Sequence, residues 1–215
     1  MLIIFSGIDG SGKSTQIKLL KNSLLSKEKV VETLWARGGY TKGFESVKRA
    51  LRRFLGNRLP EPGKTKIREQ KMSNPFIVYI WLSFSIIDLI FFWGLYVRLK
   101  LILGRYVICD RYIMDTYVDF KINFPTANFE KMILWRLLSY IVPKEKNAFL
   151  LYINVEESVR RSKLKQEPFP DTKETLIIRS AYYLDKDLFS ENDYLILNCN
   201  ESIISIHNKI IKYLD

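Results

Sequence analysis

Apolar runs alternate with segments of helical periodicity along this chain. Five runs are predicted to be strands: residues 2–6, 30–35, 105–109, 148–154 and 194–198. Most of them are continuously apolar, which is typical of strands buried on both faces of a parallel sheet. Because helical segments separate the strands, the order predicts an α/β fold, namely a doubly wound, parallel five-stranded sheet flanked by helices.

The helical segments have apolar residues at spacings of three and four. They are predicted at residues 13–25, 42–55, 76–97, 128–142, 173–188 and from 201 onward. Without internal repeats, residues 1–215 are expected to form a single domain. The Gly- and Pro-broken segment 56–75 is predicted to be a mobile basic insert, and the basic, Pro-interrupted segment 160–173 a lid.

Residues 76–97 are the most apolar part of the chain, with Asp88 as their only charge. Their length would suit a membrane span. However, a carboxylate near the middle of a bilayer is costly, and a span would separate motifs that must share one site. We therefore expect a buried or dimer-forming helix rather than a transmembrane helix. Peripheral contact with a membrane stays an alternative.

The chain carries 34 Lys and Arg against 23 Asp and Glu, a net charge of +11. This excess favours acidic partners, although a solvated basic surface would look the same. Cys109 and Cys199 form no CxxC pair, which is typical of free thiols in a reducing compartment. The first residues lack the pattern of a signal peptide, so we expect a cytoplasmic protein.

Residues 7–14, GIDGSGKS, match the phosphate-binding loop pattern G-x-x-x-x-G-K-[ST], between a predicted strand and a predicted helix. Glycines let backbone N–H groups approach phosphate oxygens, and the helix N-terminus adds partial positive charge. Lys13 would reach the β- and γ-phosphates of ATP, and Ser14 would ligate Mg²⁺. The residues expected to hold the nucleotide are Gly7, Gly10, Ser11, Gly12, Lys13, Ser14 and Thr15.

Charged residues follow the other predicted strands. Asp110 and Arg111 directly follow the predicted strand 105–109. The carboxyl ends of parallel strands meet at one edge of the sheet, so these two residues should lie near the phosphate-binding loop. Asp110 is therefore predicted to hold the metal with Ser14, although a strand-end salt bridge is the alternative. Arg37 is available to an anionic acceptor. Phosphoryl transfer needs positioned charge rather than a catalytic histidine, so these residues fit a small kinase.

The chain resembles the thymidylate kinase family in the order of its sequence motifs. The resemblance rests on GIDGSGKST (7–15), GRYVICDRY (104–112) and the helix containing IIRSAYYL (177–184). It implies Mg-dependent transfer from ATP to dTMP, and a homodimer, for which helix 76–97 would supply the interface. The resemblance implies that Asp9 reads the 3′-hydroxyl of the acceptor sugar. Some members carry an arginine after this acid, where this chain has Gly10.

Because Gly10 replaces that arginine, the lid is expected to supply the cation. The predicted catalytic residues are Lys13, Asp110, Arg111, Arg161 and Lys165. The predicted substrate-binding residues are Asp9, Arg37, Phe84, Asp88, Arg111 and Phe120. Phe84, Asp88 and Phe120 stand at or near the positions where the family reads thymine, and two of them differ from its usual residues.

These departures leave the acceptor open, because hydrogen-bond readout carries most discrimination among bases. The alternative is a kinase of the same fold for another nucleotide or for a phosphorylated sugar or lipid precursor. A third reading is a non-catalytic protein that binds nucleotides or nucleic acid through its positive charge. We favour the kinase over the nucleic-acid binder because the loop and the Asp110–Arg111 strand end occur together.

Overall fold

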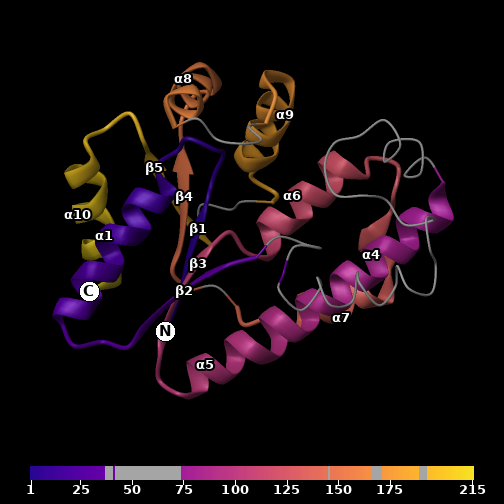
Figure 1. Ribbon diagram of the computed structural model, residues 1–215, viewed down its shortest axis with the longest axis horizontal. Coiled ribbons are helices and arrows are strands. Elements are labelled where there is room, and N and C mark those ends of the chain that lie inside the picture. Colours follow the sequence, from indigo (N-terminus) through magenta and orange to yellow (C-terminus); the bar gives the residue numbers. More distant parts are fainter. Residues whose placement is uncertain (37–40, 42–73, 145, 166–170, 189–192) are drawn as a thin grey trace. The chain divides into compact units, whose positions relative to one another are not determined.

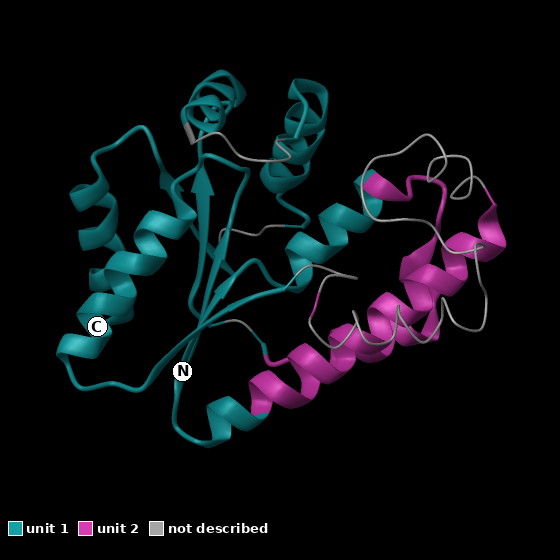
Figure 2. Cartoon of the chain, in the orientation of Figure 1, with its two compact units in different colours: residues 1–36, 99–122, 144–215 teal, residues 37–98, 123–143 magenta. Residues whose placement is uncertain are grey.

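The computed structural model describes residues 1–36, 41, 74–144, 146–165, 171–188 and 193–215 (Figure 1). Its contacts divide the chain into two compact units, coloured separately in Figure 2. Unit 1 comprises Met1–Ala36, Leu99–Ile122 and Lys144–Asp215, and unit 2 comprises Arg37–Arg98 and Asn123–Pro143. The expected single domain stays a prediction. The predicted basic helix 42–55, most of the insert and residues 166–170 of the lid lie outside the described residues.

Unit 1 contains the predicted parallel five-stranded sheet, which is confirmed. The strand order is β2-β3-β1-β4-β5. The strands are β1 (Leu2–Ser6), β2 (Val31–Trp35), β3 (Tyr106–Asp110), β4 (Ala148–Tyr152) and β5 (Tyr194–Asn198). All five residues of β1 are buried, as expected for the centre of a sheet covered on both faces. Asp110 pairs with Phe5 of β1 and with Trp35 of β2, so three strands end at one edge.

Helices cover both faces of this sheet, as the doubly wound prediction requires. On one face α1 (Lys13–Ser26) packs against α10 (Ile203–Leu214) (Figure 1). Ser23 of α1 shares a 3.1 Å hydrogen bond with His207 of α10, so the only histidine joins two helices. On the other side of the sheet lies α6 (Ile113–Asn123), while α8 (Val155–Lys165) and α9 (Lys173–Leu184) pack together beyond the carboxyl end of β4 (Figure 1). Helix α9 ends at Leu184, four residues before the predicted end of helix 173–188.

Unit 2 contains the apolar helix. It comprises α4 (Pro75–Leu89) and the π-helix η2 (Ile90–Val97), and α5 (Arg98–Ile102) follows without a break. The Asn74 side chain caps α4, so the last two residues of the predicted insert belong to this helix start. A 3₁₀ turn, η3 (Phe129–Lys131), and α7 (Ile133–Ile141) replace the predicted continuous helix 128–142. Met132 interrupts it with an extended backbone.

Close packing joins η2 to α7 within unit 2. A Cβ on Gly94 would lie 2.6 Å from Cγ2 of Ile141, so glycine allows this approach. Among the described residues, the helix over residues 75–102 is the one long and apolar enough to cross a membrane, with a hydropathy of 2.1. Only a third of its most apolar window is buried. The composition alone does not show membrane insertion.

A buried ion pair joins α6 to α9 in unit 1. The Arg179 side chain is 1% exposed, and its Nη1 donates to Asp119 Oδ1 at 2.5 Å. Its Nε donates to Asp171 Oδ2 at 3.0 Å. Two carboxylates therefore compensate one buried guanidinium.

We expect Asp119→Asn to lower the free energy of unfolding by about 3 kcal/mol, because removing one partner leaves a buried charge undercompensated. Urea unfolding at pH 7 measures the change. The control is Glu201→Gln, which removes one charge from the exposed contact with Lys209 at 2.6 Å and should barely shift the midpoint. Equal shifts in the two variants would show that burial of the Asp119 pair adds nothing.

Candidate phosphate-binding site

The phosphate-binding loop connects the end of β1 to the start of α1, and its shape depends on glycine. Gly7 has φ +139°, and a Cβ there would lie 2.4 Å from the backbone oxygen of Leu151. Gly12 has φ +94° and would meet nothing within 4 Å, so it faces open space. Gly7 thus lets the loop pack against β4, and Gly12 leaves the start of α1 open to a ligand.

Gly10 brings α8 against the loop. At φ +75°, a Cβ on Gly10 would lie 3.0 Å from the backbone oxygen of Ser158. The Ser158 hydroxyl donates to the Asp9 carbonyl at 2.6 Å. Arg161 donates to the Gly10 carbonyl at 3.5 Å and to that of Cys199 at 3.1 Å. Gly10 therefore lies beside an arginine supplied by α8.

Lys13 is buried inside the loop. Its side chain Nζ donates to the carbonyls of Gly7 and Ile8, both at 2.9 Å, and the residue is 7% exposed. Burial lowers the pKa of Lys13 to about 8, and the positive charge of Arg111 adds to this effect. The ammonium is thus held by weak neutral acceptors that phosphate oxygens could replace.

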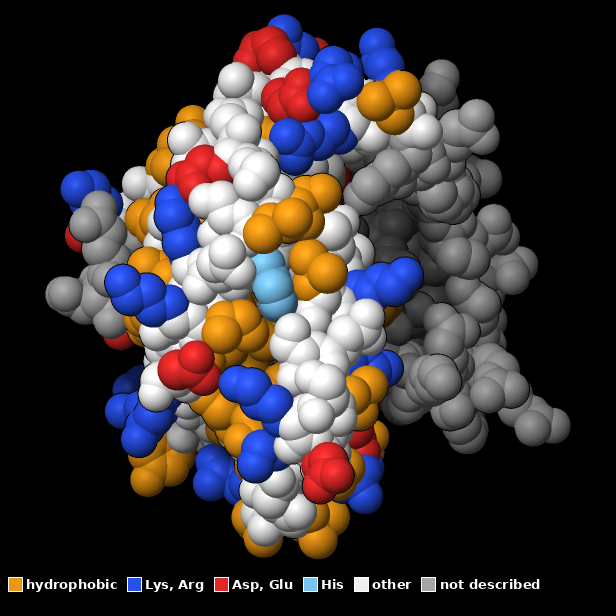
Figure 3. Space-filling model, turned by 90° about the vertical axis from the view of Figure 1, so that its left-hand side faces the viewer, with side chains coloured by type: hydrophobic (Ala, Val, Ile, Leu, Met, Phe, Trp, Pro, Cys, Tyr) orange, Lys and Arg blue, Asp and Glu red, His pale blue; other side chains and the backbone are white. Residues whose placement is uncertain are grey.

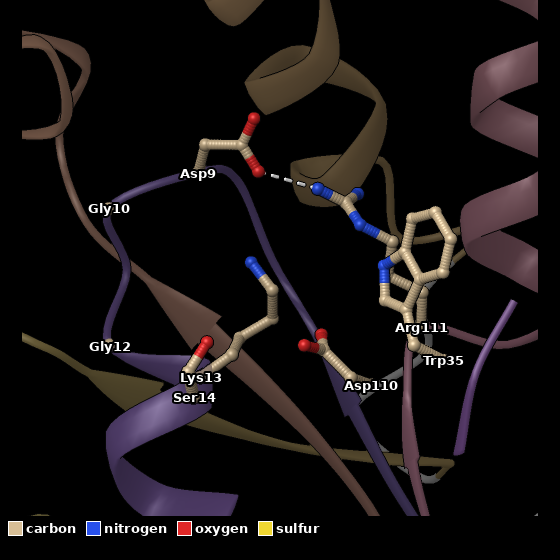
Figure 4. Close-up of a pocket in the computed structure, with 8 residues that line it drawn as sticks. All are labelled: Asp9, Gly10, Gly12, Lys13, Ser14, Trp35, Asp110 and Arg111. Atoms are coloured by element: carbon tan, nitrogen blue, oxygen red, sulfur yellow. Dashed lines mark hydrogen bonds and ion pairs between the residues drawn. The ribbon is translucent and has the colours of Figure 1, made fainter. Parts of the chain in front are cut away.

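Asp110 lies across the pocket from Lys13 (Figure 4). Burial raises the pKa of its carboxyl group above the usual range. Within the described part of the chain, Asp110 Oδ1 and Ser11 Oγ are buried without a hydrogen-bond partner. Ser14 lines the same pocket with an exposed side chain. Asp110 and Ser14 thus present oxygens to the pocket, as a metal–phosphate ligand requires, whereas Ser11 is not among the residues that line it.

These donors fit Mg²⁺ rather than a metal held by protein alone. The described residues contain no cluster of three or more His, Cys, Asp or Glu. Mg²⁺ is commonly bound by one or two carboxylates together with substrate phosphates. Asp110 and the Ser14 hydroxyl would provide such a partial set.

Arg111 is held in an uncommon backbone conformation with φ +76°. Such strain in a non-glycine residue persists where the surroundings determine it, often at functional sites. Its Nη2 donates to Asp9 Oδ1 at 2.6 Å, and its Nη1 donates to the Tyr183 hydroxyl at 3.4 Å. The pair formed by Asp9 and Arg111 is drawn in Figure 4. Both residues line the pocket with Lys13 and Asp110.

Trp35 is a pocket residue that sequence reasoning missed. It ends β2, pairs in register with Asp110 and is 51% exposed at the pocket. Figure 4 draws it with Arg111 among the residues that line the pocket. A tryptophan two residues before the predicted Arg37 site, at the end of a strand, was the signal that could have identified it.

The remaining predicted residues are placed as follows. Thr15 is exposed on the first turn of α1. Arg37 and the side chain of Lys165 lie outside the described residues. Phe120 is 3% exposed on α6 and is not among the residues that line the pocket.

Phe84 and Asp88 belong to unit 2, one turn apart on α4. Thr41, 5% exposed, donates a hydrogen bond to Asp88. The structure therefore brings together the loop, Asp9, Asp110 and Arg111, with Arg161 against the loop. The roles of Phe84, Asp88 and Phe120 stay predictions.

We expect ATP binding to weaken as the pH rises from 7 to 9.5, because Lys13 loses its proton as the pH passes its lowered pKa of about 8. The loss should be on the order of 10-fold if the protonated side chain is the form that binds. Calorimetric titration with MgATP measures it. Lys13→Arg, which stays charged throughout, should give a flat profile, and a flat wild-type profile would contradict this assignment.

No protein-family model matches the chain. The chain is 28% identical over 215 residues to a probable thymidylate kinase of Methanocaldococcus jannaschii, covering all of this chain and 95% of the relative. It is 29% identical over 176 residues to the probable thymidylate kinase 2 of Saccharolobus solfataricus, covering 78% of this chain and 68% of the relative. A 39-residue match, 56% identical, joins it to a thymidylate kinase of Prosthecochloris aestuarii, covering 18% of each chain. Over its whole length the chain is thus similar to a protein named as a probable thymidylate kinase, and this similarity supports the resemblance that its motifs indicated.

Proposed function

We propose that the protein is a Mg-dependent nucleoside monophosphate kinase that transfers the γ-phosphoryl group of ATP to dTMP, giving dTDP and ADP. The observation that carries this proposal is the pocket in which Lys13, Asp110 and Arg111 meet at the glycine loop. The relatives named thymidylate kinases support the acceptor. That name belongs to those proteins, so dTMP is the acceptor we infer for this one.

The described residues can perform the transfer through charge and position. An oxygen of the acceptor phosphate attacks the γ-phosphorus, and the bond from that phosphorus to the β–γ bridging oxygen breaks. Lys13 and Arg111 would bind the equatorial and bridging oxygens, on which negative charge is distributed. Asp110 and Ser14 would hold Mg²⁺, which would supply further charge neutralisation when bound. Arg161 of the predicted lid donates to the loop carbonyl of Gly10 and would add a further cation beside the loop.

Two pocket residues favour a nucleotide as the acceptor. Trp35 presents a half-exposed aromatic ring at the rim of an otherwise polar pocket, and such rings stack on bases. Asp9 places a carboxylate where a sugar hydroxyl could donate to it. A phosphorylated sugar would use Asp9 but not Trp35, and a lipid precursor would use neither in this way.

Binding to nucleic acid receives less support. Figure 3 shows the face formed by α1 and α10, where basic and acidic side chains are interspersed with apolar ones. No basic stripe of the kind that tracks a phosphate backbone runs over this face.

We further propose that the enzyme is a homodimer joined through the apolar helix. Phe91 and Leu95 on η2 are 62% and 53% exposed. They lie in the most apolar segment of the chain, so a large apolar surface faces water there. Covering such side chains stabilises by roughly 25 cal/mol per Å² of buried apolar area. A second copy would remove this surface from water without requiring a membrane.

The homodimer predicts a solution mass of twice the 25.4 kDa chain, measured by size-exclusion chromatography with light scattering. Leu95→Glu should shift the protein to monomers, because a carboxylate would be buried at the interface. Ile204→Glu on α10, where the native side chain is 72% exposed, is the matched control and should leave the mass unchanged. A wild-type monomer, or equal dissociation by the control, would contradict the interface.

A cytoplasmic location is part of the same proposal. Both cysteines are free and buried, as expected of a protein in a reducing compartment. Recovery of the protein in washed membranes after cell fractionation would oppose this location and would favour lipid contact by residues 75–102.

The acceptor is tested by ADP release from MgATP with dTMP, dUMP, UMP, CMP, AMP, GMP or no acceptor. We expect dTMP to stimulate release most strongly. Lys13→Ala should lower turnover by at least about 100-fold, because it removes a charge that binds the transferred phosphoryl group. Circular dichroism checks that this variant folds.

Asp9→Asn should raise KM for the acceptor more than KM for ATP, since its proposed partner is the acceptor sugar. Stimulation by a different nucleotide alone would reassign the acceptor. Silence across the panel, with MgATP still bound, would reject the nucleotide acceptor and leave a kinase of the same fold for another phosphorylated compound.

A further inference from the structure

Two buried polar contacts join α6 to α9, one on each of two successive turns. Asp115 and Asp119 lie four residues apart on α6, and Arg179 and Tyr183 lie four residues apart on α9. The Tyr183 hydroxyl donates to Asp115 Oδ1 at 2.5 Å, and Arg179 pairs with Asp119 at 2.5 Å. The spacing of one helical turn fixes both the distance between the helices and their register.

Asp115 is itself fixed by two further donors. Its Oδ2 accepts from the Ser6 hydroxyl at 2.7 Å and from the Tyr112 N–H at 2.8 Å. Ser6 is the last residue of β1, and Tyr112 directly follows Arg111. The carboxylate that holds Tyr183 is therefore anchored to the same strand ends that carry the phosphate loop and Arg111.

The direction of the Tyr183 hydrogen bond follows from the chemistry of its neighbours. An ionised carboxylate only accepts, so the phenolic proton points to Asp115. The oxygen lone pairs remain for Arg111 Nη1, 3.4 Å away. Asp9 accepts from the other end of the same guanidinium, at Nη2. A loop carboxylate and a helix phenol thus hold the two ends of one planar group.

Burial makes this arrangement effective. Tyr183, Arg111 and Asp115 are 3%, 5% and 1% exposed. With little water to compete, each hydrogen bond is stronger than it would be at the surface, and an unmade bond costs more. Tyr183 is not among the residues that line the pocket, whereas Arg111 is. Its influence on the site would therefore pass through Arg111.

We propose that Tyr183 is a positioning residue for phosphoryl transfer: with Asp115 as its anchor, it orients the Arg111 guanidinium toward the transferred group. This inference rests on the proposed kinase function for its kinetic consequence. The ion pair of Arg179 with Asp119 assists by holding α9 at the register in which Tyr183 meets Asp115. In the phosphoryl-transfer transition state a misoriented arginine costs rate more than it costs ATP binding.

The kinetic test compares Tyr183→Phe with Tyr182→Phe, which removes the same hydroxyl from the partly exposed neighbour on α9. Tyr183→Phe should lower kcat by about 10-fold and leave KM for ATP within about 2-fold. Tyr182→Phe should change neither. Equal losses in the two variants, or a loss confined to KM, would overturn the proposal.

A double-mutant cycle separates positioning from general destabilisation. In an Arg111→Lys background the planar two-ended group is gone, so Tyr183→Phe should cost less than about 2-fold in kcat. The same 10-fold loss in both backgrounds would mean that Tyr183 acts independently of Arg111, and the proposal would fall. Thermal unfolding of each variant confirms that folded proteins are compared.

A readout independent of activity comes from the guanidinium resonances of protein labelled with ¹⁵N-arginine. The Arg111 Nε–H signal is identified by its loss in Arg111→Lys. It should shift or broaden in Tyr183→Phe and stay in place in Tyr182→Phe, and an unchanged signal in Tyr183→Phe would reject the contact. If the wild type phosphorylates no acceptor, the kinase proposal fails, while this spectrum still decides whether Tyr183 orients Arg111.

Discussion

The site depends on keeping two cations buried at the carboxyl ends of a parallel sheet. Lys13 and Arg111 are 7% and 5% exposed, and burying an unpaired charge is costly. The fold compensates them in different ways. Lys13 has two neutral backbone carbonyls, while Arg111 has the Asp9 carboxylate and the Tyr183 hydroxyl. Lys13 is therefore the less satisfied of the two, which explains its lowered pKa and prepares it for an anionic ligand.

This compensation requires close backbone approach, and glycine supplies it. A side chain at Gly7 would collide with β4, and one at Gly10 would press on α8. With glycine at both positions, the loop carbonyls reach Lys13, and α8 brings Ser158 and Arg161 to the loop. The three features of the site, a cradled lysine, a neighbouring lid arginine and an open start of α1, thus follow from one loop sequence.

Much of this arrangement could be predicted from the sequence because its signals are local. The loop needs particular residues at fixed spacing, and continuous apolar runs identify buried strands, so the sheet and the position of Asp110 follow. The contacts of Arg179 and Tyr183 could not be predicted, since they join residues about sixty apart through the packing of two helices. Trp35 was missed for a related reason. A strand-end aromatic residue normally indicates core packing, and only the register with Asp110 brings it to the pocket.

The carboxylate of Asp9 is the part of the site that charge alone does not explain. Beside a triphosphate it would be repelled, unless a cation lies between the two groups. Arg111 is placed to do this, because its Nη2 contacts Asp9 while the residue also lines the pocket. The two residues therefore form a unit: Arg111 lets the loop tolerate an acid, and the acid fixes one end of Arg111. An acceptor that brought its own phosphate to Arg111 would weaken that pair and leave Asp9 ready to accept from a hydroxyl. An acceptor carrying both groups, a phosphate and a sugar hydroxyl, matches this unit better than one carrying either group alone.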